Sequence, residues 1–191
     1  MLFSFLVTLR EGIEIALVVT ILLGYLRNIG QTRHFREIWL GAGAAALLSI
    51  AFGAVLEITS RELDGRWLEA FEGFTMLFAV CVLTWMVFWM KRQSAGISKD
   101  LREQVDSALS RGSIVALSLL AFSAVAREGF ETVLFLFAGS TNATSGIEFW
   151  AGGGLGFAIA AVAGAVIYYG AARVPLRQFF LASSVVVIVL A

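Results

Sequence analysis

The chain has 191 residues, no formal net charge and 59% hydrophobic residues, whereas soluble domains are about 45–50% apolar. With one proline it is neither disordered nor collagen-like, and its neutral charge indicates no nucleic-acid partner. The single Cys81 cannot form an internal disulfide. We therefore predict an all-α integral membrane protein, a polytopic helical bundle in which residues 1–191 form a single membrane domain.

Six apolar segments are long enough to cross a bilayer, which takes about 20 residues. In chain order they cover 2–26, 38–57, 70–90, 112–138, 147–171 and 175 to the end. The sixth is still apolar at Ala191, so we expect the chain to be truncated within its sixth span.

The long connection 91–111 has its own pattern. Apolar residues recur there every four positions, at Ile97, Leu101, Val105 and Leu109. This spacing predicts a cytoplasmic amphipathic helix that lies on the inner membrane surface.

Basic residues indicate the orientation. The first, third and fifth connections carry ten of the 14 Lys and Arg residues, which places these connections in the cytoplasm and the N-terminus outside. We therefore expect a multi-pass protein of the cytoplasmic membrane. The outer connection between spans two and three is acidic, with Glu57, Glu62, Asp64, Glu69 and Glu72.

One charged pentapeptide occurs twice inside apolar spans. Span one contains Arg10-Glu11-Gly12-Ile13-Glu14, and span four contains Arg127-Glu128-Gly129-Phe130-Glu131. At about 100° per residue, the arginine and both glutamates of each motif share one helix face, and the glycine lies opposite, where another helix can pack closely. Ionisable groups at this depth are costly, on the order of 2.5–3.5 kcal/mol each, so they must face one another, water or a bound ion.

The motifs belong to a longer repeat. The second motif follows the first by 117 residues, and six positions of span two, Trp39, Gly41, Gly43, Gly53, Ala54 and Val55, match residues of span five 111 positions later. The repeating unit therefore has three spans: residues 1–90 form the first three-helix repeat and residues 112–191 the incomplete second. An odd number of spans inverts the second copy, and inverted repeats are typical of secondary transporters.

The two motifs together have the composition of a cation site. Four carboxylates and two guanidinium groups leave a charge of −2, and carboxylate oxygens without thiolate or imidazole favour hard ions of charge two or three. A purely structural pair of Arg–Glu bridges would need only two of the four glutamates. A membrane di-iron oxidase would use Glu-x-x-His pairs, and the only histidine, His34, lies in the first cytoplasmic connection.

At these residues the chain resembles the high-affinity iron permeases, the oxidase-dependent iron transporters that partner a ferroxidase in fungi, and their bacterial counterparts. That family carries Arg-Glu-Gly-Leu-Glu in its first and fourth membrane helices, and Ile13 and Phe130 replace the leucine here. The stretch from Phe71 to Met90 is also similar. The family has seven spans, so the resemblance implies that the end of span six and all of span seven are missing.

The resemblance also implies a function, a permease rather than an enzyme. Iron, ferric or ferrous, would be the substrate, with no organic cofactor. It would be carried by Glu11, Glu14, Glu128 and Glu131, with Arg10 and Arg127 beside them, and received outside by the Glu-x-x-Glu pair Glu69 and Glu72.

Partners and rival functions stay open at this point. The expected partners are membrane lipid and a separate ferroxidase or periplasmic iron-delivery protein, and a homo-oligomer is an open alternative. Two rival functions also remain: transport of another hard divalent cation, manganese or calcium, and a membrane metal sensor or assembly subunit that binds without transport.

Overall fold

The computed structural model describes residues 1–93, 97–110, 114–140 and 145–170, and all of its regular structure is helical. Five long helices coincide with the first five predicted spans, and the predicted sixth span lies outside the described residues. In chain order the α-helices are α1 (Leu2–Asn28), α2 (Phe35–Glu62), α3 (Arg66–Gln93), the short α4 (Ile97–Ser110), α5 (Ile114–Ser140) and α6 (Gly146–Tyr168).

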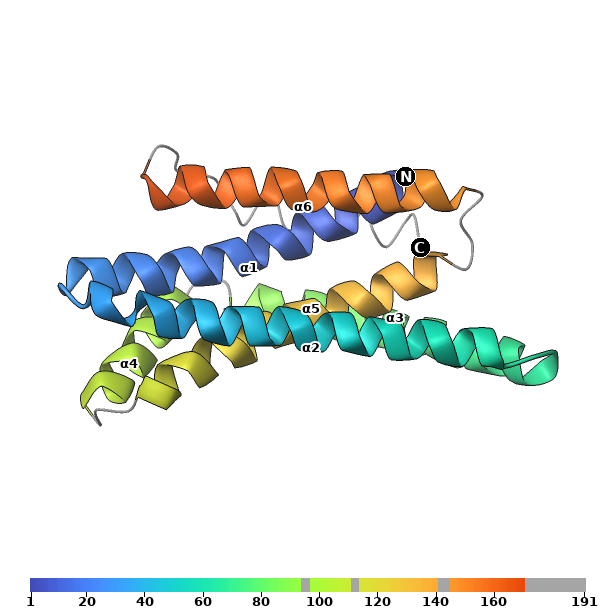
Figure 1. Ribbon diagram of the computed structural model, residues 1–191, viewed down its shortest axis with the longest axis horizontal. Coiled ribbons are helices and arrows are strands. Elements are labelled where there is room, and N and C mark those ends of the chain that lie inside the picture. The colour runs from blue at the N-terminus through green and yellow to red at the C-terminus, as the bar shows by residue number, and fades with distance from the viewer. Residues whose placement is uncertain (94–96, 111–113, 141–144, 171–191) are drawn as a thin grey trace.

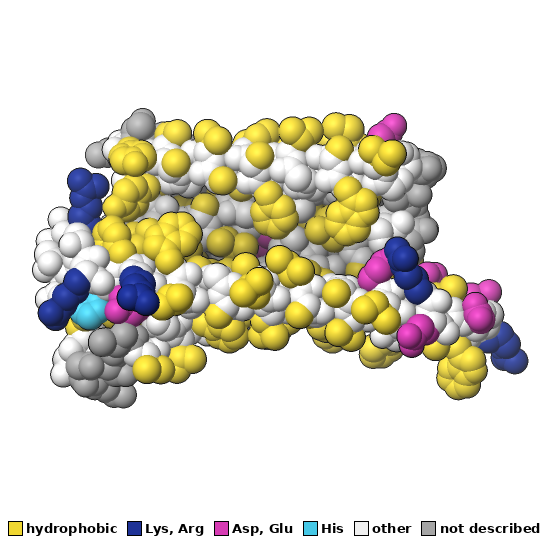
Figure 2. Space-filling model, in the orientation of Figure 1, with side chains coloured by type: hydrophobic (Ala, Val, Ile, Leu, Met, Phe, Trp, Pro, Cys, Tyr) yellow, Lys and Arg dark blue, Asp and Glu magenta, His cyan; other side chains and the backbone are white. Residues whose placement is uncertain are grey.

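The long helices have the dimensions and surface of membrane helices. Each has 23 to 28 residues, or about 35–42 Å at 1.5 Å per residue, enough for a hydrocarbon core of about 30 Å. Among the described residues, α2 with its preceding turn and α6 are apolar enough throughout to qualify as spans by composition. Hydrophobic side chains cover the long sides of the molecule, and charged side chains gather towards its two ends (Figure 2).

Two parallel helix pairs form the body of the bundle. The α1 helix packs most extensively on α6, α2 packs most extensively on α5, and α1 also contacts α5 (Figure 1). The α1 and α5 helices run in opposite directions, as do α2 and α6. The α3 helix contacts α5 and α2. The crossing of α1 with α5 therefore lies between the two pairs.

Glycines permit the close approach within each pair. A Cβ atom placed on Gly12 of α1 would lie 2.6 Å from the Ala160 Cβ of α6. A Cβ atom on Gly129 of α5 would lie 2.9 Å from the Ser49 Cβ of α2. Both separations are shorter than a carbon–carbon contact of about 3.5–4.0 Å. The predicted role of the motif glycines as packing positions is confirmed.

The same contacts recur in both pairs with the sequence offsets of the repeat. Gly12 and Gly129 differ by 117 positions, and their neighbours Ser49 and Ala160 differ by 111. A second pair of contacts corresponds in the same way. A Cβ atom on Gly164 of α6 would lie 2.7 Å from the Ala16 Cβ of α1, and a Cβ atom on Gly53 of α2 would lie 3.2 Å from Val133 Cγ1 of α5.

A third correspondence involves backbone oxygens. A Cβ atom on Gly41 of α2 would overlap the carbonyl oxygen of Ser118 in α5. A Cβ atom on Gly152 of α6 would meet the carbonyl oxygen of Met1 at the start of α1. The glycines again differ by 111 positions and the carbonyl residues by 117.

The amphipathic helix between the units forms as predicted, and its apolar face packs on the helix bundle; its place at the membrane surface stays a prediction. Leu101, Val105 and Ala108 of α4 are buried in one hydrophobic cluster with residues of α1, α2 and α5. The apolar face packs against the helix bundle because α1 and α5 present leucines at this end, among them Leu22, Leu26 and Leu117. Polar residues such as Arg102 and Asp106 remain exposed.

We predict opposite effects for two alanine substitutions in α2. Gly41→Ala should lower the free energy of unfolding by about 1–3 kcal/mol, because the new methyl group meets backbone atoms of α5. Gly43→Ala should raise it by up to about 1 kcal/mol through helix propensity, since nothing lies within 4 Å of that position. Unfolding midpoints of the detergent-solubilised variants would test the pair, and equal effects would contradict the packing described.

Candidate metal centre

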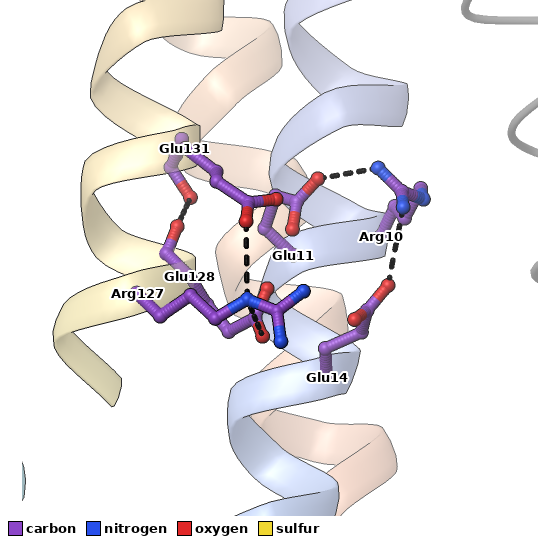
Figure 3. A network of polar contacts seen from close by, with 7 residues as sticks. Arg10, Glu11, Glu14, Arg127, Glu128 and Glu131 are labelled. Atoms are coloured by element: carbon purple, nitrogen blue, oxygen red, sulfur yellow. Dashed lines mark hydrogen bonds and ion pairs between the residues drawn. The ribbon is translucent and has the colours of Figure 1, made fainter. Parts of the chain in front are cut away.

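The two charged pentapeptides meet where α1 crosses α5 (Figure 3). Arg10, Glu11 and Glu14 come from the middle of α1, and the second arginine and its two glutamates come from the middle of α5. Each motif places its charged side chains on one helix face, because residues three and four positions apart are neighbours on a helix surface. The glycine of each motif faces the other way, towards α6 or α2.

Each arginine pairs with both glutamates of its own motif. Arg10 Nη1 donates to Glu11 Oε1 at 2.6 Å, and its Nη2 lies 3.4 Å from Glu14 Oε1. Arg127 Nε donates to Glu131 Oε1 at 3.2 Å and lies 3.8 Å from an oxygen of Glu128. The arginines therefore compensate part of the negative charge and hold the carboxylates in place.

Three of the four glutamates converge across the helix crossing. Carboxylate oxygens of Glu11, Glu128 and Glu131 lie within 4.8 Å of one another, and all three residues are buried. Each of the three also has a buried carboxylate oxygen with no hydrogen-bond partner among the described residues. Buried carboxylate oxygens without a partner are costly, so this group is poised to accept a ligand that supplies positive charge.

The fourth glutamate is held apart from this group. Glu14 lies beside Arg10, and its side chain is 12% exposed. Its counterpart in the second motif, Glu131, is part of the converging group. The structure therefore brings together three of the four predicted ligands, with Glu14 on the edge of the site.

The donor set fits a hard cation. Carboxylate oxygens bind first-row divalent ions at about 2.0–2.2 Å, so three oxygens around one ion lie about 3.0–3.6 Å apart. Small side-chain movements would bring the three oxygens to that separation. A cation would relieve the repulsion between the carboxylates, and the absence of sulfur or imidazole ligands from the group favours a hard ion.

Sequence reasoning missed two groups of supporting residues. Ser49 and Ala160 back the two motif glycines and so set how closely each motif helix approaches its partner. Thr132 is buried next to the second motif, where its hydroxyl donates to the carbonyl oxygen of Glu128 at 2.7 Å. The signal for the first group was in the sequence, because these two residues are related by the same offset of 111.

The other predicted positions lie outside the carboxylate group. Glu69 is exposed in the first turn of α3, and Glu72 is half-buried one turn later. His34 is buried at the corner between α1 and α2, where its Nδ1 lies 3.8 Å from Glu37 Oε2. Among the described residues one group of three or more His, Cys, Asp or Glu residues has converging ligand atoms, and it contains none of these residues.

The fold and the site together define an integral membrane protein of long apolar helices with a buried cluster of carboxylates at a helix crossing. The chain matches the model of the Iron permease FTR1 family over residues 1–191. It belongs to this family, which confirms the predicted family.

Curated relatives agree with this assignment. The ferrous iron permeases EfeU of Escherichia coli O6:K15:H31 (strain 536 / UPEC) and Shigella sonnei (strain Ss046) are each 41% identical over 182 residues, 94% of this chain and 66% of theirs. The ferrous iron permease EfeU of Yersinia pestis is 38% identical, over 94% of this chain and 64% of its own. The chain thus spans somewhat less than two thirds of these relatives. No solved structure matches.

The two arginines should differ in their effect on stability. Arg10 is 1% exposed and Arg127 is 37% exposed in their side chains. Replacing Arg10 by methionine leaves Glu11 as an uncompensated buried charge, which costs about 3–5 kcal/mol. Arg127→Met should cost clearly less, because the exposed Arg127 guanidinium is screened and stabilises its glutamates less strongly.

Unfolding midpoints in detergent would measure the two effects. Combining Arg10→Met with Glu11→Gln should recover part of the loss, because the charge that Arg10 compensates is then removed. Equal destabilisation by both single variants, or no recovery in the double variant, would contradict this account of the charges.

Proposed function

We propose that the protein transports iron across the cytoplasmic membrane into the cell. The observation that carries this proposal is the buried convergence of Glu11, Glu128 and Glu131, each with an oxygen that lacks a partner. Glu14 would complete the ligand set when the ion moves. The relatives are named ferrous iron permeases, which favours Fe²⁺ as the ion carried.

An inverted repeat would allow this site to open alternately towards the two sides of the membrane. Exchange of the two units converts α1 into α5 and α2 into α6, so the α1–α6 pair becomes the α5–α2 pair. The recurrence of glycine contacts at offsets of 117 and 111 supports this symmetry. The opposite directions of α1 and α5 support it as well (Figure 1). The site at the α1–α5 crossing would then lie near the membrane midplane, as in other inverted-repeat transporters.

The basic residues indicate which end of the bundle faces the cytoplasm, and the proposed direction of transport uses this orientation. Arg27, Arg33 and Arg36 lie where α1 ends and α2 begins, and further basic residues lie in the stretch from the end of α3 to the start of α5. The positive-inside rule places these connections in the cytoplasm and the N-terminus outside. The ion would enter from the end where α2 meets α3 and leave at the end where α4 lies.

Charge balance explains how one site could bind and release the ion. The four glutamates and two arginines carry a net charge of −2, which a divalent cation neutralises. The ion would exchange its water for carboxylate oxygens, and a rocking movement of one unit against the other would expose it to the cytoplasm. The arginines would limit affinity by competing for the same carboxylates, because a site that binds too tightly cannot conduct.

Delivery would occur at the outer end of α3. Glu69 and Glu72 would receive iron there from a separate ferroxidase or periplasmic iron-delivery protein. Both residues lie near the turn between α2 and α3, on the same side of the helix. Homo-oligomerisation remains an alternative for the assembled protein.

We predict that iron uptake depends on the second motif. In vesicles that carry the protein, Glu131→Gln should lower the initial rate of radioactive iron uptake at least tenfold, because it removes one of three converging carboxylates. The matched control is Glu148→Gln, which changes an exposed glutamate at the start of α6 and should transport normally. Both variants should insert in equal amounts.

The same vesicles separate the rival functions. If manganese or calcium blocks iron uptake at equal concentration and is itself taken up equally well, the proposed substrate would be another hard cation instead of iron. Iron binding without uptake in the unmodified protein would identify a sensor or assembly subunit. Normal uptake by Glu131→Gln would show that the motifs are structural and would contradict the proposed site.

The receiving role of α3 predicts a different kinetic effect. Glu69→Gln combined with Glu72→Gln should raise the iron concentration for half-maximal uptake several-fold and leave the maximal rate nearly unchanged, because the buried site is intact. Glu62→Gln at the end of α2 is the matched exposed control. Loss of maximal rate in the double variant would instead place these residues in the transport step.

A further inference from the structure

The geometry points to α4 as a gate that seals the end of the transport path at which α4 lies, and we propose that α4 must leave α1 and α5 before the ion can leave. This inference rests on the proposed function, because it concerns the path from the same carboxylates. It arises from a difference between the two ends of the α1–α5 crossing.

On the α4 side of the carboxylates the crossing is closed by apolar side chains. Past Glu14, α1 contributes Val19, Leu22 and Leu26, and before Arg127, α5 contributes Leu117 and Ala121, all of them buried. From α4, Val105 enters the same cluster and is 0% exposed, with Leu101 and Ala108 beside it. A hydrated or carboxylate-bound cation cannot cross such a cluster without a large desolvation cost.

The opposite end also has an apolar cluster, in which Val7, Ala79 and Phe135 are buried, but no described residue of α4 joins it and a cavity lies beside it. A cavity of about 650 Å³ extends there from Val125 and Gly129 along α5 to Ser140, and along α2 to Arg61. Figure 2 shows a hollow between α6 and α2 with acidic atoms deep inside it.

The repeat makes the comparison between the two ends direct. Val19 and Leu23 are buried in the cluster at the α4 end. Their counterparts 117 positions later, Leu136 and Ser140, line the cavity at the other end. Equivalent positions are therefore closed at one end and open at the other, and α4, which lies between the two repeats, packs on the closed end.

Polar contacts hold α4 in this position and can break without unfolding it. The Tyr25 hydroxyl of α1 donates to Asp106 Oδ1 of α4 at 2.6 Å, and this hydrogen bond is exposed to solvent. The Arg102 guanidinium lies over the Tyr25 ring, 5.7 Å from its centre. Exposed contacts of this kind are individually weak, so they position the helix without locking it.

The test tethers α4 to α1 reversibly. Tyr25→Cys and Asp106→Cys are introduced together in a Cys81→Ser background, since Cys81 is the only native cysteine. A short bis-methanethiosulfonate reagent links the pair and dithiothreitol releases it. The control pair, Gln104→Cys with Ser107→Cys, links two exposed positions within α4 alone and leaves the helix free to move.

Iron binding and iron uptake are measured on the same vesicles. We expect the tethered pair to bind iron normally, to lose at least nine tenths of its uptake, and to recover that uptake with dithiothreitol. The control pair should transport under all conditions. Uptake that continues through the tether would overturn the gate and leave the iron-transport proposal standing, whereas absence of uptake from the untethered parent protein would overturn the transport proposal itself.

A second measurement does not depend on the tether. Val105→Cys in the same background places a thiol at a fully buried position of the seal. A membrane-permeable maleimide should label it several-fold faster while iron is transported than without iron. An iron-independent labelling rate, in a variant that still transports, would contradict a moving α4.

Discussion

The structure depends on one constraint: six ionisable groups with a net negative charge are placed in the middle of two apolar helices. Neither α1 nor α5 could expose its motif to lipid, because each charged group would cost on the order of 2.5–3.5 kcal/mol there. The helices therefore have to cross with their motifs face to face. Within that crossing, each arginine lies beside the glutamates of its own motif, and part of the negative charge stays uncompensated.

Close packing by glycine makes this crossing possible. Gly12 and Gly129 bring α6 and α2 against the backs of the two motif helices, so that α1 and α5 are each held from behind while their charged faces meet. Because the same contacts occur in both pairs, the two motifs reach the crossing in equivalent ways. Such equivalence would suit a transporter that exposes one site alternately to the two sides of the membrane.

The chemical symmetry of the motifs is not matched by their geometry. Glu131 joins the converging carboxylates whereas Glu14 remains beside Arg10, and Arg127 is far more exposed than Arg10. The two ends of the crossing also differ, since apolar residues and α4 close one end and a cavity extends from the other. Two halves with one sequence pattern thus differ in the packing around their motifs and at their ends.

The sequence by itself determined the helices, their membrane character, the family and the residues of the charged motifs, because hydrophobic length, helical periodicity and a repeated pentapeptide are local properties. It could not determine which carboxylates meet, because Glu11 and Glu14 share a helix face and only the crossing with α5 distinguishes them. Nor could it show what the apolar face of α4 packs on: such a face is equally suited to a membrane surface and to a helix bundle, and Leu22, Leu26 and Leu117 come together beside α4 only once the chain has folded.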